Sequence, residues 1–190
     1  LYASVGHHPN HIEVFDEAKI RKLLTHPTVV AVGECGLDYS RLENVTSEIK
    51  RAQKELFEKH LELAREFKKP LIIEILKEAK KRNPNLLGDI HFFVGGTTEA
   101  EALVTLSFTI SFTAVITFAR DYDEVIKTIP LMSILSETDS PYVAPASRRG
   151  ARNDPLAVEE VVAKIAEIKG EDLETVRQVL LANTQKMFSL

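Results

Sequence analysis

The chain has 190 residues, 44% of them hydrophobic and 27% charged, which is typical of one globular domain with a substantial core and excludes a disordered or fibrous protein. Its formal net charge of -4 argues against a protein that holds nucleic acid through an overall basic surface, so any phosphate contact has to be local. The single cysteine, Cys35, excludes an internal disulfide, and with no signal-peptide pattern at the N-terminus we expect a reducing, cytoplasmic location.

Short apolar runs alternate with amphipathic helical stretches along the chain. The runs predict strands at residues 1–6, 28–33, 70–73, 89–93, 108–112 and 131–137. The clearest helix covers 47–68, with Thr46 or Ser47 as its cap. Further helices are predicted from about 99, where Thr98 and Glu101 form a capping box, from Asp154-Pro155 to Gly170, and from about 172 to 187.

Residues 102–119 contain no charged side chain and are about long enough to cross a bilayer. Polar and apolar residues alternate between Thr105 and Thr113, and a period of two belongs to a strand. We therefore predict the end of a helix followed by a strand, and no membrane segment.

The alternation of strand and helix indicates an α/β fold with parallel strands and right-handed crossovers, either a doubly wound sheet or a (β/α) barrel. No linker or low-complexity run divides the sequence, so we expect one domain over residues 1–190. In both architectures functional side chains gather at the carboxyl ends of the strands.

Three metal-ligand residue types occupy such strand ends: Glu34, His91 and Asp139. Carboxylate and imidazole groups that converge there suit Mg²⁺, Mn²⁺ or Zn²⁺. Taken singly, each has an ordinary explanation, as a hydrogen-bonded core histidine, an ion-pair partner or a helix cap. Their shared position on successive strands is what favours a metal site.

Two loops add candidate ligand-binding groups. The stretch 147–155, SRRGARNDP, precedes a predicted helix and offers arginine side chains and backbone N–H groups to an anion, although the same composition also suits a solvated loop. The stretch GHHP, residues 6–9, follows a strand, and its histidines could bind a metal or a phosphate or only shape a turn.

The blocks GHHPN (6–10), VVAVGECGLDY (29–39), SETDSPYVAP (136–145) and RRGARNDP (148–155), with the strand that contains His91, resemble the successive signatures of the TatD family of metal-dependent deoxyribonucleases. The resemblance implies a TIM (β/α)8 barrel of the amidohydrolase type, one or two divalent metal ions, and hydrolysis of phosphodiester bonds in a DNA substrate, commonly by an exonuclease acting from the 3′ end.

Transferred residue by residue, the resemblance makes Glu34, His91 and Asp139 metal ligands, with Glu34 bridging if two ions bind and Asp139 also taking a proton from the attacking water. It places His8 beside the substrate. Three residues of the 148–155 block match the loop near the phosphate: Arg149, Arg152 and Asn153.

The sequence also departs from the family pattern. The family begins with a strand bearing an H-x-H pair of ligands, and we expect the barrel to lack its first two βα units in this chain, which is N-terminally incomplete. A family histidine expected after the strand at 70–73 is replaced by Glu74, which suggests a missing loop of about ten residues. Two alternatives stay open: a hydrolase of small amides or esters on the same fold, and a non-catalytic, degenerate barrel that serves as a binding module.

Overall fold

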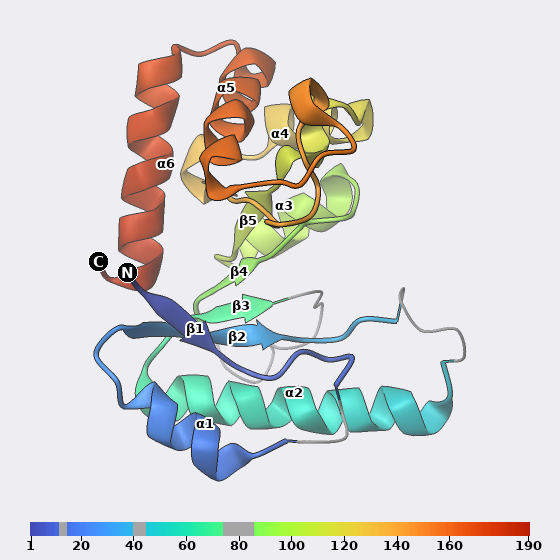
Figure 1. The fold of residues 1–190 in the computed structure, drawn as a ribbon, viewed down its shortest axis with the longest axis vertical. Coiled ribbons are helices and arrows are strands. Elements are labelled where there is room, and N and C mark those ends of the chain that lie inside the picture. The colour runs from blue at the N-terminus through green and yellow to red at the C-terminus, as the bar shows by residue number, and fades with distance from the viewer. Residues whose placement is uncertain (12–14, 40–44, 74–85) are drawn as a thin grey trace. The chain divides into compact units, whose positions relative to one another are not determined.

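The computed structural model describes residues 1–11, 15–39, 45–73 and 86–190 (Figure 1). The chain forms two compact units, one of residues 1–91 with 187–189 and one of residues 92–186 with 190. That residues 1–190 form a single hydrolase domain stays a prediction.

The first unit is built on four parallel strands, which lie side by side in chain order: β1 (Ala3–Val5), β2 (Val29–Cys35), β3 (Leu71–Ile73) and β4 (Gly88–Ile90). Leu71 opposes Gly88 and Ile73 opposes Ile90 in the β3–β4 ladder. Parallel pairing requires a crossover between successive strands, and the helices at 17–24 and 47–67 supply two of these crossovers. The predicted strands of this part of the chain and their parallel arrangement are confirmed, but the strand predicted at 89–93 ends at Ile90.

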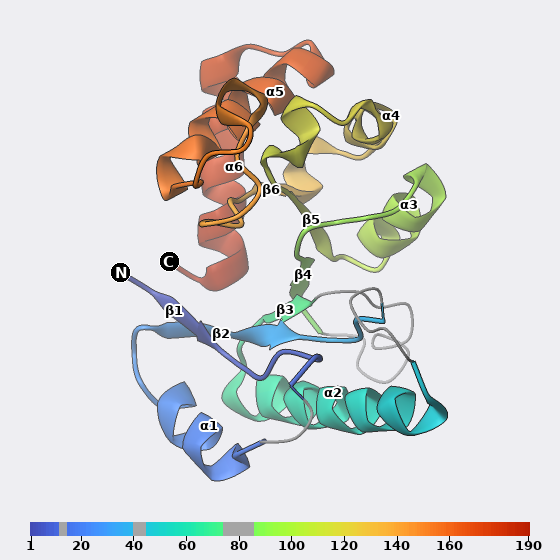
Figure 2. The same cartoon turned by 45° about the vertical axis from the view of Figure 1, so that its right-hand side comes forward.

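Two helices, α1 (Glu17–Leu24) and α2 (Ser47–Phe67), lie on the same side of β1 and β2 (Figures 1 and 2). The Thr46 hydroxyl caps α2 by accepting the Ile49 N–H, and Lys68 ends the helix in a left-handed conformation. The predicted helix over 47–68 is therefore confirmed, with Thr46 as its cap. Its buried apolar side chains include Leu56, Phe57 and Leu63, and each stabilises the fold by about 1.5–3 kcal/mol through burial.

Strand β2 contains a bulge directly before its carboxyl end. Val32 opposes Leu71 and Cys35 opposes Ile73, so Gly33 and Glu34 together face the single residue Ile72. Gly33 has a φ of +155°, and a Cβ atom on it would lie 2.7 Å from the Ile72 carbonyl oxygen. Glycine is thus required at position 33 both by the backbone angle and by the close approach of β3.

The second unit contains a parallel pair, β5 (Thr109–Phe112) and β6 (Ile134–Ser136), in which Ile110 opposes Ile134. Helices α3 (Thr97–Thr105) and α4 (Asp123–Thr128) pack against each other, and α5 (Val158–Lys169) packs on α4 and β6. Helix α6 (Leu173–Phe188) ends the chain. Short 3₁₀ helices occupy Ala114–Thr117, Arg120–Tyr122, Leu131–Ser133, Ala146–Arg148 and Pro155–Ala157.

Several predicted boundaries in this unit need correction. Helix α3 begins two residues earlier than predicted, and the Glu99 carboxylate accepts the Gly96 N–H at 3.3 Å, so the capping box of Thr98 and Glu101 is wrong. The strand predicted at 131–137 is shorter, because Leu131–Ser133 turns as a 3₁₀ helix after Pro130. Asp154 and Gly170 cap their helical segment as predicted.

Residues 102–119 form the end of α3 and then β5, as predicted from their alternation. Among the helices that the structure describes, none combines the length and the apolar character needed to span a bilayer.

Candidate metal and phosphate site

Glu34 and His91 meet in the first unit. Glu34 lies inside β2, in the bulge, rather than after the strand as predicted, because pairing continues to Cys35. His91 directly follows β4 instead of lying inside a strand, and its N–H donates to the Ile73 carbonyl at 3.0 Å. The Glu34 Oε1 and His91 Nε2 atoms are 3.5 Å apart, with 40% and 10% of the respective side chains exposed.

This separation is slightly longer than one shared ion requires. Metal–ligand bonds of about 2.1 Å at octahedral or tetrahedral angles place two neighbouring donor atoms about 3.0–3.4 Å apart. An oxygen and an imidazole nitrogen are also suitable donors for Mn²⁺ or Zn²⁺, and the partly exposed carboxylate leaves an approach from solvent. The pair therefore fits a divalent metal.

The complete three-residue site stays a prediction. Over the described residues, no group of three or more His, Cys, Asp or Glu side chains is gathered to hold a metal ion. Asp139 belongs to the second unit, where it follows β6 in a turn closed by a 2.7 Å hydrogen bond from the Tyr142 N–H to the Asp139 carbonyl. Glu74 and the stretch in which a further histidine was expected lie outside the described residues.

His8 lies in the loop after β1, and hydrogen bonds hold the residues of this loop on both sides of it. The His7 N–H donates to Nε2 of His60 at 2.9 Å. The His8 Nδ1 accepts the Asn10 N–H at 3.2 Å, and the His8 carbonyl accepts the His11 N–H at 3.0 Å. Because Nδ1 is an acceptor, the ring proton of neutral His8 is assigned to Nε2.

A buried polar network joins this loop to the one after β2. The Asn10 side-chain amide donates to Asp38 Oδ2 at 2.8 Å. The Gln53 side chain forms two hydrogen bonds with the Asp38 backbone, accepting its N–H at 3.0 Å and donating to its carbonyl at 2.9 Å. Asp38 and Gln53 are 2% and 0% exposed, so the network is shielded from water.

The sequence reasoning missed Gln53 and His60. Both are fully buried on α2, between apolar residues of the same helix face. His60 donates from Nδ1 to the Leu56 carbonyl at 2.8 Å, and burial lowers its pKa below the ordinary value, which keeps the ring neutral at pH 7. The sequence does contain one indication of these two residues: they lie seven residues apart on a helix face that is otherwise apolar.

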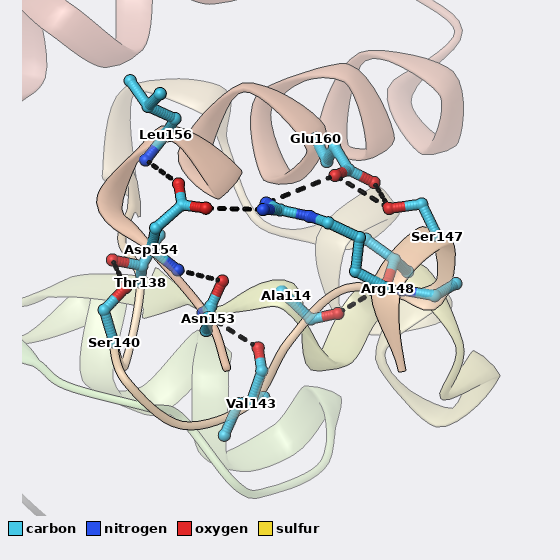
Figure 3. Close-up of polar contacts among 12 residues, drawn as sticks. Ala114, Thr138, Ser140, Val143, Ser147, Arg148, Asn153, Asp154, Leu156 and Glu160 are labelled. Atoms are coloured by element: carbon cyan, nitrogen blue, oxygen red, sulfur yellow. Dashed lines mark hydrogen bonds and ion pairs between the residues drawn. The ribbon is translucent and has the colours of Figure 1, made fainter. Parts of the chain in front are cut away.

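In the second unit, the arginines of the 147–155 loop differ in their contacts: one forms ion pairs and two are exposed. Arg148 reaches Asp154 and, at 3.9 Å, Glu160 on α5, while the Ser147 hydroxyl also donates to Glu160 (Figure 3). The bond from Arg148 is the main cause that lowers the pKa of the Asp154 carboxyl, which also accepts the Leu156 N–H. Arg148 is therefore engaged in holding the loop on α5.

The other two arginines are exposed. The Arg149 guanidinium stacks on the Phe118 ring, 3.8 Å from its centre, and neither Arg149 nor Arg152 forms an ion pair with any described residue. Asn153, in contrast, is 3% exposed, and its amide donates to the carbonyls of Tyr142 and Val143 at 2.8 and 3.1 Å (Figure 3 shows the Val143 bond). Asn153 thus fastens the loop to the turn after Asp139.

The chain is similar in sequence to metal-dependent hydrolases. Residues 1–189 match the family model described as TatD related DNase. The chain is 36% identical over 200 residues to the uncharacterized metal-dependent hydrolase YcfH of Escherichia coli K12, covering 98% of this chain and 73% of that protein. It is 34% identical over 203 residues to the uncharacterized metal-dependent hydrolase YabD of Bacillus subtilis 168, covering 100% and 78%.

The crystal structure of YJJV, a TatD homologue from E. coli K12, superposes with a TM-score of 0.85 at 29% identity, covering all of this chain and 77% of that one. A TatD family hydrolase from Entamoeba histolytica superposes at 0.83 with 20% identity, which supports the fold alone. The α/β fold is thus that of the TatD homologues, which are TIM barrels. The chain belongs to the TatD family of metal-dependent hydrolases.

Proposed function

We propose that the protein is a divalent-metal-dependent deoxyribonuclease that hydrolyses phosphodiester bonds from the 3′ end of DNA in the cytoplasm. The observation that supports it most is the 3.5 Å approach of Glu34 Oε1 to His91 Nε2, a carboxylate and an imidazole close to the separation of two ligands of one ion. Family membership supports the hydrolytic, metal-dependent chemistry.

In this proposal Glu34, His91 and Asp139 hold the metal, with Mg²⁺, Mn²⁺ and Zn²⁺ as candidates. The bound ion supplies Lewis acidity and makes a water molecule more acidic. Asp139 accepts the proton of the water that attacks phosphorus, and the ester oxygen that leaves takes up a proton as its bond to phosphorus breaks.

The phosphate would be held by Arg149 and Arg152, which form no ion pair with a described residue, together with His8. Arg149 and Arg152 are exposed on one loop and offer planar N–H forks to phosphate oxygens. His8, which the family resemblance places beside the substrate, would contact the same kind of oxygen. A local basic loop explains how a chain of net charge -4 can hold a polyanion.

The first test is Mn²⁺ binding by isothermal titration calorimetry. Wild-type chain, Glu34→Gln and His91→Ala are compared with Glu62→Gln, which removes a carboxylate from the exposed face of α2. Loss of either proposed ligand should weaken Mn²⁺ binding by at least about 10–100-fold, while the Glu62 variant should bind as wild type does.

The second test is cleavage of a 5′-labelled single-stranded oligonucleotide with a free 3′ end, with Mn²⁺ present. We expect a ladder that shortens from the 3′ end, lost in Glu34→Gln and in Asp139→Asn. If the wild-type chain binds Mn²⁺ and cleaves small esters or amides but leaves DNA intact, the nuclease proposal is wrong. If it binds none of Mn²⁺, Mg²⁺ and Zn²⁺, the non-catalytic alternative is favoured for this chain.

A further inference from the structure

Tyr142, in the second unit, carries an exposed aromatic ring on a backbone that hydrogen bonds hold from several sides. Its N–H donates to the Asp139 carbonyl at 2.7 Å, and its carbonyl accepts the Asn153 side-chain amide at 2.8 Å. The Asn153 N–H also donates to the Pro141 carbonyl at 3.0 Å. Yet 70% of Tyr142 is exposed, and among the described residues its side chain has no hydrogen-bond or stacking partner. The ring is thus held at the surface with its faces open.

A single exposed tyrosine is ordinary on a protein surface, so its surroundings decide what it can bind. Arg152 directly precedes Asn153, whose hydrogen bonds tie the 147–155 loop to Tyr142. Arg149, on the same loop, lies with its guanidinium over the Phe118 ring. Both arginines are exposed and form no ion pair with a described residue. An open aromatic ring therefore lies on a turn fastened to a loop that offers two cations.

The loop that carries these arginines is itself held in place. Arg148 pairs with Asp154, whose carboxylate also accepts the Leu156 N–H at 2.9 Å (Figure 3). The Ser147 hydroxyl donates to Glu160 of α5 at 2.7 Å. Groups that are fixed before binding lose less conformational entropy when a ligand arrives. The ring and the two cations are therefore prepared to act together on one ligand.

An aromatic face beside cations matches a nucleotide unit of a single strand. A nucleobase stacks on an aromatic side chain whatever its identity, because every base has a π face, and the attached phosphate accepts hydrogen bonds from arginine. An apolar protein segment would cover the ring but would bury the two arginines without a counter-charge, which is costly. An acidic peptide would pair with the arginines and make no use of the ring. Charge complementarity and the open ring together favour the nucleotide.

We propose that Tyr142 stacks on a nucleobase of a DNA strand whose phosphates contact Arg149 and Arg152. This inference rests on the proposed function and adds a base-binding site to it. Tyr142 follows Asp139, the proposed metal ligand, by three residues in a hydrogen-bonded turn, which keeps their Cα atoms within about 7 Å. The stacked base therefore belongs to a nucleotide next to the bond that is cleaved, and the site accepts any of the four bases.

The first test measures binding without cleavage. Fluorescence anisotropy of a 5′-fluorescein-labelled oligothymidylate, in EDTA and low salt, gives the Kd of the full chain. A strand of the same length in which every base is replaced by an abasic tetrahydrofuran site retains the phosphates alone. The wild-type chain should bind the strand with bases more tightly by about 5-fold or more, because one stacked base contributes that much. Equal affinity for the two strands, or binding of neither, would overturn the proposal.

Variants of Tyr142 distinguish stacking from a structural role. No backbone hydrogen bond of the turn uses its side chain, so the variants should fold. Tyr142→Ala and Tyr142→Leu should both lose the preference for the strand with bases, whereas Tyr142→Phe, which retains an aromatic face, should keep it. Tyr2, 61% exposed in the first unit, is the matched control, and Tyr2→Ala should change neither affinity. Equal weakening of both strands by Tyr142→Ala would contradict stacking.

Cleavage separates this inference from the proposed function. With Mn²⁺ present, Tyr142→Ala should raise KM for the single-stranded oligonucleotide about 5-fold or more and change kcat less than about 3-fold, because uniform binding is lost. If the wild-type chain cuts DNA and Tyr142→Ala has the same KM, the base-binding site is refuted and the nuclease proposal stands. If the wild-type chain prefers the strand with bases but cuts no DNA, the nuclease proposal fails and the base-binding site stands.

Discussion

Gly33→Ala is expected to destabilise the first unit strongly. The new Cβ would lie 2.7 Å from the Ile72 carbonyl oxygen and 2.8 Å from the Ile72 Cβ, so β2 and β3 would have to separate at the bulge. An alanine at positive φ costs about 1–2 kcal/mol, and forcing a methyl group into a packed region costs about 1–3 kcal/mol. The sum predicts a loss of about 2–5 kcal/mol in the free energy of unfolding.

Gly150→Ala is the matched control. Gly150 also has a positive φ, +84°, but no atom lies within 4 Å of the position where its Cβ would be built. This control should therefore show only the backbone cost of about 1–2 kcal/mol. The excess loss in Gly33→Ala isolates the close approach of β3.

Urea unfolding followed by circular dichroism at 222 nm suits this comparison, because the chain has no tryptophan for fluorescence. With a urea dependence of about 2 kcal/mol per molar, Gly33→Ala should lower the midpoint by about 1–2.5 M. A midpoint equal to that of Gly150→Ala, with an unchanged slope, would show that the space around Gly33 can adapt and would refute the reasoning.

Three further predictions concern buried or exposed polar side chains. Burial lowers the pKa of His60 below 6.5, so as the pH falls through 6.5 this histidine takes up a proton in the unfolded chain before it does so in the folded chain. The urea midpoint should therefore decrease between pH 7.5 and 5.5. The decrease should be smaller in His60→Gln. Asn153→Asp places a carboxylate against the Tyr142 and Val143 carbonyls and should lower the free energy of unfolding by about 2–4 kcal/mol. A thermal melt measures this loss, and a melting temperature within about 2 °C of that of the wild type would contradict it. Arg152→Ala should raise KM for single-stranded DNA and reduce by about 0.7 the slope of the logarithm of the DNA-binding constant against the logarithm of the salt concentration. Arg177 is the control, because its guanidinium is paired with Glu159 and Glu174, and Arg177→Ala should change neither quantity.

The strands were predictable because each is a short apolar run that parallel pairing buries. Val29–Cys35 and Leu71–Ile73 contain the apolar side chains that fill the interior, and their order along the chain is their order in the first unit. The exact strand ends were less predictable, since they depend on pairing partners. Glu34 was expected after β2 but lies within it, because Cys35 still pairs with Ile73.

The polar interior of the first unit was not predictable from local pattern. Gln53 and His60 interrupt an apolar helix face, and nothing in the sequence indicates that their partners are backbone groups 15 and 53 residues away. In the same way, the three arginines of RRGAR look alike in sequence. Only folding shows that Arg148 pairs with Asp154, while Arg149 and Arg152 stay exposed.

The bulge in β2 changes how relatives of this chain should be compared. The additional residue at positions 33–34 determines to which face of the sheet the side chain after the bulge, that of Cys35, points. A homologue could retain both the acid and the cysteine, but a single-residue deletion there would turn the acid to the other face of the strand, away from the metal site that we propose. The number of residues between Val32 and Cys35 is therefore as informative about the proposed metal site as the identity of Glu34.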